Sequence, residues 1–279
     1  MFLFCGLNTA RQMVGTWRQT VRDGTVLAAI GTALLAVHFW VPVDVRAQLV
    51  FDHERVAPWS LLTAAYVHNS TQHLLGNLVG YGIGAAIAYL LCVGQDRRRW
   101  FWMTTSVFLI VLPILVNVTS YAAFQTLGLE PTSRGFSGVV AGFVGFILVA
   151  LARQIADDYG LTVGWRVGQG VFLLLLGEIS VIYTGMPSLL ISGLLVVGLG
   201  LSFGQLGLQG LRQDWDATER RKVALDMVFA GLVVVLLIVY VWILFPATLV
   251  QRGTVTNIAA HGLGFLSGIL LSTFLLVGR

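Results

Sequence analysis

A serine, two histidines and an asparagine stand where long apolar segments of this chain begin. Ser137 lies within Gly135-Phe136-Ser137-Gly138 at the start of one segment. His73 and Asn77 open another segment, and His261 opens the last one. A serine hydroxyl is a weak nucleophile unless an adjacent base, most often an imidazole, takes its proton. These residues therefore point to acyl transfer, with Ser137 as nucleophile and His261 as general base.

The same chemistry needs donors for the oxyanion that forms when a carbonyl is attacked. Each preorganised donor in a water-poor site contributes about 2.7–4 kcal/mol. His73 and Asn77 are four residues apart, so on a helix their side chains share one face. An imidazole N–H and a carboxamide NH2 can both point at one oxygen. We predict an oxyanion hole made by these two side chains and the backbone N–H of Ser137.

The elements that must position these residues are membrane spans. Hydrophobic residues make up 57% of the chain and charged residues 11%, with a mean hydropathy of +0.84, whereas soluble domains are about 25% charged. Strand-like alternation is absent, so the apolar runs predict helices and an all-α, polytopic membrane bundle. We predict about eight spans, over residues 26–43, 73–93, 100–118, 137–153, 168–185, 187–206, 225–245 and 257–277.

The basic residues fall mostly on one side of these spans. All of them except Arg46, Arg55, Arg134 and Arg252 lie in segments that an inside amino terminus would place in the cytoplasm. The positive-inside rule therefore predicts that both termini are cytoplasmic. The formal charge of +4 does not indicate nucleic acid, because no basic face with interleaved aromatic residues occurs.

The domain organisation follows from the same pattern. Residues 1–24 are expected to form a short cytoplasmic tail, and residues 25–279 one membrane domain. Cys5 and Cys92 map to the cytoplasmic side and have no metal-binding spacing, so we expect no disulfide, no metal and no cofactor. Nearly all basic residues are arginine, which favours a GC-rich prokaryotic genome and a multi-pass protein of its plasma membrane.

The predicted topology brings the reactive residues to one surface. The spans that begin near His73, Ser137 and His261 all run from outside to inside, so these residues should lie near the outer face. Small residues that allow close helix packing occur along two of these spans. They are Gly138, Ala141, Gly142 and Gly145 after the serine, and Ala260, Gly264 and Gly268 around the last histidine.

Three motifs resemble those of the rhomboid intramembrane serine proteases. The chain has His68-x4-His73-x3-Asn77, then Gly-x-Ser-Gly around Ser137, and finally Ala260-His261-x-x-Gly264. The resemblance covers roughly 57–153 and 225–277. It implies a rhomboid-like core of six helices, to which this chain adds a helical hairpin between the serine and histidine spans.

The resemblance also implies roles for individual residues. Ser137 and His261 would form a catalytic dyad, and His73, Asn77 and the Ser137 amide the oxyanion hole. Supporting roles would belong to His68, Gly135, Gly138 and Gly264. Substrates would be single-span transmembrane proteins in the lipid bilayer, cut near the outer interface, with the helix over 225–245 as their lateral gate.

Two positions depart from the family pattern. Ser60 follows Trp59 where many members have an arginine that braces the outer loop, and Ala141 replaces a tyrosine that stacks on the catalytic histidine. Without an acidic partner nearby, we expect Asn257 to orient the His261 ring.

Two other functions fit parts of the pattern. A rhomboid-like pseudoprotease would bind or escort transmembrane segments without cleavage, although such relatives generally lose the serine or the histidine. Glu178, an ionisable residue within a predicted span, would instead indicate a transporter or proton-coupled carrier.

Overall fold

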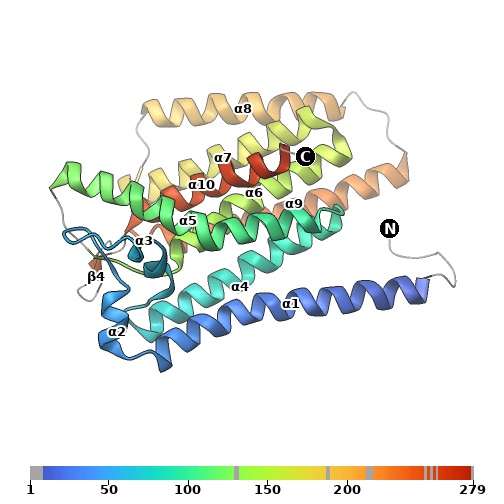
Figure 1. Cartoon of the computed structure of the whole chain (residues 1–279). Coiled ribbons are helices and arrows are strands. Elements are labelled where there is room, and N and C mark those ends of the chain that lie inside the picture. Colours follow the sequence, from blue (N-terminus) through green and yellow to red (C-terminus); the bar gives the residue numbers. More distant parts are fainter. Residues whose placement is uncertain are drawn as a thin grey trace.

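The computed structural model describes residues 9–128, 132–186, 189–211, 216–247, 250–251, 254–255 and 257–277. Long helices lie side by side, and short elements gather near one end of the bundle (Figure 1). The all-α class is confirmed, and the chain is a multi-pass membrane protein. The elements are α1 (Thr9–Trp40), α2 (Val43–Gln48), β1 (Phe51–Asp52), α3 (Ser60–Thr63), η1 (Ala64–Tyr66), α4 (Thr71–Gly94), α5 (Arg98–Leu127), β2 (Thr132–Ser133), α6 (Ser137–Tyr159), α7 (Leu161–Thr184), α8 (Leu189–Leu211), α9 (Ala217–Leu244), β3 (Val250–Gln251), β4 (Thr254–Val255) and α10 (Ile258–Val277).

Within the described ranges, 7 helices are long and apolar enough to cross a membrane. They are α1, α4, α5, α6, α7, α9 and α10, and each coincides with a predicted span. The remaining predicted span, 187–206, coincides with α8, whose described apolar portion, Leu189–Ser202, is shorter. Because the first residues of α6 and α10 meet, the chain must cross the bundle an odd number of times between the end of α6 and the start of α10, and α7, α8 and α9 lie in that interval.

Several helices extend beyond their predicted bounds. The third span was predicted to end at 118, but α5 continues to Leu127 and stops at Gly128, which has a φ of 64°. Asn117 does not end the helix because its amide donates to the carbonyl oxygen of Leu61 at 2.8 Å. Polar residues are compatible with a span when tertiary contacts satisfy their hydrogen bonds.

The predicted cytoplasmic tail is also largely helical. α1 begins at Thr9 and runs without a break through residue 25, the expected start of the membrane domain; residues 1–8 lie outside the described ranges. Asp23, buried on α1, forms an ion pair with Arg98 at the start of α5 and accepts a hydrogen bond from Tyr89 of α4 at 2.8 Å. This cluster ties α1 to the bundle.

α6 is the central helix of the bundle. It packs against α4, α7, α9 and α10, and 67% of the residues in its most apolar stretch are buried inside the protein. Its approach to α10 is set by glycines on both helices: a Cβ on Gly264 would overlap the carbonyl oxygen of Gly138, and one on Gly268 that of Gly142. The predicted small-residue packing of these two helices is therefore present.

We expect Gly264→Ala to destabilise the protein, because the added methyl would meet backbone rather than a flexible side chain. Overpacking of this kind typically costs about 1–3 kcal/mol. Gly262→Ala is the matched control on the same helix, since its Cβ would meet nothing within 4 Å. Thermal unfolding in detergent micelles should show a lower midpoint for Gly264→Ala alone. Equal midpoints would contradict the inferred close approach.

Candidate active site

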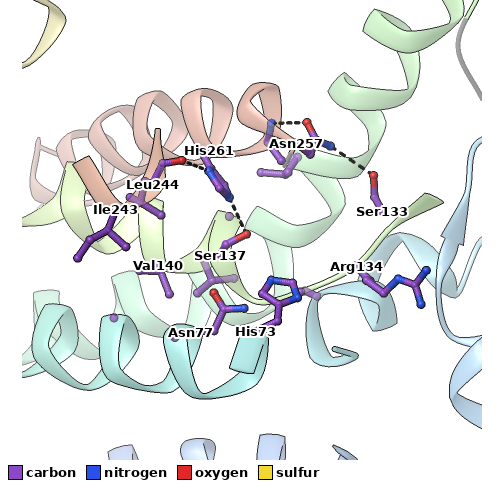
Figure 2. A pocket seen from close by; sticks show the side chains of 18 of the residues that line it. His73, Asn77, Ser133, Arg134, Ser137, Val140, Ile243, Leu244, Asn257 and His261 are labelled. Atoms are coloured by element: carbon purple, nitrogen blue, oxygen red, sulfur yellow. Dashed lines mark hydrogen bonds between the residues drawn. The ribbon is translucent and has the colours of Figure 1, made fainter. Parts of the chain in front are cut away.

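Ser137 and His261 meet at the start of their helices. The Oγ of Ser137 lies 2.8 Å from the Nε2 of His261, although the two residues are separated by 124 positions in the sequence. Figure 2 shows the imidazole of α10 pointing directly at the serine hydroxyl of α6. The predicted pair is therefore within hydrogen-bond distance, as a nucleophile and its general base must be.

The other ring nitrogen of His261 is held by the backbone. Nδ1 contacts the carbonyl oxygen of Leu244, the last residue of α9 (Figure 2). Since a carbonyl only accepts, Nδ1 carries the proton and Nε2 presents its lone pair to Ser137. The carbonyl end of α9 is also the negative end of its dipole, which favours the imidazolium formed when His261 takes the serine proton.

The prediction that Asn257 orients the His261 ring is wrong. The Oδ1 of Asn257 accepts from the backbone N of Ala260 at 2.9 Å, so the side chain caps the start of α10 instead. Leu244 was missed because its side chain carries no polar group. Its place at the end of a helix could have indicated it as a partner of His261, because the last carbonyls of a helix lack intrahelical partners.

The turn before Ser137 depends on two predicted supporting residues. Gly135 has a φ of 114°, which favours glycine, and a Cβ there would lie 2.5 Å from the Cε1 of His73. The Nε2 of His68 accepts a hydrogen bond from the backbone N of Phe136 at 3.4 Å. Burial lowers the pKa of His68 to about 3, so the ring stays neutral and keeps this acceptor. His68 therefore shapes the nucleophile turn from outside the dyad.

The predicted oxyanion donors lie beside the serine. His73 and Asn77 project from α4 toward Ser137 (Figure 2). The Nδ2 of Asn77 is buried, with no hydrogen-bond partner among the described residues. A buried donor without a partner is costly, and one that lines a cleft next to a nucleophile is available to a ligand oxygen.

His73 has a partner that the sequence reading did not assign to it. Its Nδ1 lies 2.9 Å from the Oδ1 of Asn69, one helical turn earlier. As placed, the Oδ1 of Asn69 accepts from Nδ1, which leaves Nε2 of a neutral His73 without a proton. Nε2 becomes the donor when the Asn69 carboxamide is turned so that its NH2 faces Nδ1. Asn69 thus controls which nitrogen of His73 is the donor.

A cleft of about 2140 Å³ leads to these residues between α4 and α9. Exposed apolar side chains flank it on both helices, among them Val79 of α4 and Ile243 of α9. Tyr240 of α9 bridges the two helices, donating its hydroxyl proton to the carbonyl oxygen of Gly80 at 2.6 Å. Among the described residues, no group of three or more His, Cys, Asp or Glu could hold a metal ion.

The two departures from the family pattern have local explanations. Ala141 is fully buried, and a Cβ on Gly264 would lie 3.1 Å from its methyl, so a larger side chain would separate α6 from α10. The histidine instead contacts the carbonyl oxygen of Leu244 and packs nearly perpendicular to the ring of Phe245, with the two ring centroids 6.2 Å apart. Ser60 donates to the carbonyl oxygen of Ala57 at 2.6 Å, within its own turn.

Glu178 lies on α7 and does not line the cleft. Both of its carboxyl oxygens are buried and have no partner among the described residues. It is therefore separate from the Ser137 site.

Comparisons with known proteins give no assignment. No protein-family model matches the chain, and no match is found among curated proteins or solved structures.

Proposed function

We propose that this protein is an intramembrane serine endopeptidase of the rhomboid type. The observation that carries the proposal is the 2.8 Å contact between the Ser137 hydroxyl and the Nε2 of His261, with Nδ1 held by a carbonyl. The unpaired Asn77 donor beside this pair supports it. The three motifs around His73, Ser137 and His261 agree with it.

The reaction follows from these positions. His261 takes the proton of Ser137 as the Oγ attacks a peptide carbonyl, and the oxyanion accepts hydrogen bonds from Asn77, His73 and the Ser137 amide. His261 then donates its proton to the leaving amine, which leaves an ester on Ser137. Water, activated by the same imidazole, attacks the ester and releases the carboxylate product and the free serine.

The cleft indicates the class of substrate. Its walls are apolar along α4 and α9, whereas the Ser137 end has polar groups. A single transmembrane helix of a substrate suits the apolar part, and its frayed end suits the polar part. The rhomboid resemblance implies small residues at the cleavage point. Both termini would lie in the cytoplasm of a prokaryotic cell, with α9 as the lateral gate.

A covalent probe tests this proposal most directly. A fluorophosphonate added to the protein in proteoliposomes should modify Ser137, as read by mass spectrometry of its peptides, because its hydroxyl contacts the His261 imidazole beside the unpaired Asn77 donor. A panel of single-span substrates should be cleaved in the same vesicles. Binding of the panel with neither cleavage nor labelling would favour the escort function and contradict the protease.

A further inference from the structure

Two buried side chains, His53 and Ser133, and the partly buried Asn257 form a hydrogen-bonded group next to the dyad. The Oγ of Ser133, four residues before the nucleophile, lies 2.9 Å from the Nε2 of His53. The same oxygen accepts a hydrogen bond from the Nδ2 of Asn257 at 3.3 Å, as Figure 2 shows. We call His53, Ser133 and Asn257 the loop brace. It joins three segments that are far apart in the sequence.

Asn257 links the brace to the general base. Its Oδ1 caps α10 through Ala260, and its backbone oxygen accepts from the backbone N of His261 at 3.3 Å. One side chain thus fixes the first turn of the histidine helix and bonds to the segment that leads into Ser137. Any shift between the two segments must break the bond between Asn257 and Ser133.

His53 anchors the brace to the bundle. β1 pairs antiparallel with β2, which places Phe51 opposite Ser133. The His53 ring packs at 5.0 Å from Phe124 and stacks on Tyr121 at 6.1 Å, both on α5. Its own main-chain oxygen accepts from Gln125 at 3.4 Å. The brace is therefore connected to α5 through His53.

The protonation of the brace has one consistent direction. Burial lowers the pKa of His53, against the raising effect of the Asp52 carboxylate next to it, so the ring is neutral near pH 7. Asn257 then donates to Ser133, and Ser133 donates to the Nε2 of His53. In these two hydrogen bonds the Ser133 hydroxyl donates its single proton and accepts through one lone pair.

We propose that the loop brace positions the nucleophile segment against the histidine helix, and so sets the distance between Ser137 and His261. Its three residues are positioning residues, and their effect on turnover rests on the function proposed above. They supply the bracing that the Ser60 position does not, since Ser60 bonds only within its own turn. A displacement of about 1 Å in a catalytic pair can lower the rate about a hundredfold.

Ser133→Ala tests the brace, because it removes both hydrogen bonds and leaves the cap of α10 intact. Asn257→Ser is the second variant, since a serine hydroxyl still caps the start of a helix but is too short to reach Ser133 while it does so. Ser133→Thr keeps the hydroxyl, and Thr132→Ala is the control at the exposed neighbouring position. Two readouts apply to each purified protein in micelles: amide hydrogen exchange of residues 133–139 and 258–263, and kcat and KM for a cleaved substrate.

For Ser133→Ala and Asn257→Ser we expect faster exchange in both segments and a fall in kcat of about ten- to a hundredfold, with KM within about twofold. Ser133→Thr and Thr132→Ala should resemble the wild type. Unchanged exchange in either segment would overturn the brace, and faster exchange with unchanged kcat would overturn its positioning role. If the wild-type protein neither cleaves nor labels, the protease proposal fails, while exchange still decides whether the brace exists.

Discussion

Ser137→Ala and His261→Ala should each lower the cleavage rate by about 10⁴-fold or more, and the double variant should be no slower than either single one. The two groups act as a unit, because the hydroxyl attacks only while the imidazole takes its proton. Effects within such a unit are far from additive. The measurement is initial-rate cleavage of one transmembrane substrate in proteoliposomes, with fluorophosphonate labelling of each variant alongside.

Two controls separate chemistry from folding. Ser272→Ala removes another buried serine of the bundle, whose hydroxyl bonds only to carbonyl oxygens of its own helix. His38→Ala removes a histidine that bonds to Thr71 at 3.3 Å, away from the cleft. Both should retain most of the wild-type rate. Residual cleavage near the wild-type level in Ser137→Ala would exclude the dyad as the source of activity.

Much of the site could be predicted because the order and spacing of residues encode it. Span parity alone places Ser137 and His261 on one face, and the structure brings them to 2.8 Å. The backbone partner of His261 could not be predicted, because a carbonyl is available at every residue. Only the meeting of the ends of α9 and α10 selects Leu244.

The fold was predictable to the level of the apolar runs, and less so at their ends. Asp23 would end a span if it faced lipid, yet α1 continues through it because Arg98 and Tyr89 satisfy its carboxylate. Asn117 is accommodated in α5 in the same way. Such partners come from other helices, so the residues around a span boundary do not reveal them.

The helices α7 and α8 leave the starts of α6 and α10 on the same side of the bundle. α7 and α8 lie between the serine helix and the helix that precedes His261, and together they restore the direction of the chain. α7 packs against α6, α8 and α9. An insertion of an even number of spans preserves the Ser137 and His261 encounter, whereas a single added span would separate them by the thickness of the bilayer.

The second large effect is expected at the oxyanion hole. Asn77→Ala should lower kcat by about 10²–10³-fold with little change in KM, because the lost donor acts on charge that develops only in the transition state. His73→Ala should also lower kcat. The measurement is a substrate titration in micelles that yields kcat and KM separately for each variant.

The unpaired Nδ2 of Asn77 separates an effect on catalysis from an effect on stability. Its Nδ2 is buried and has no partner among the described residues, so removing it breaks no existing hydrogen bond of that donor. Asn77→Ala should therefore unfold at the wild-type temperature or slightly above it, since an unpaired buried donor is itself destabilising. Gln72→Ala, at an exposed position on the same helix, is the control for activity. A large loss of stability together with the loss of kcat would identify Asn77 as a structural residue and leave the oxyanion without its amide donor.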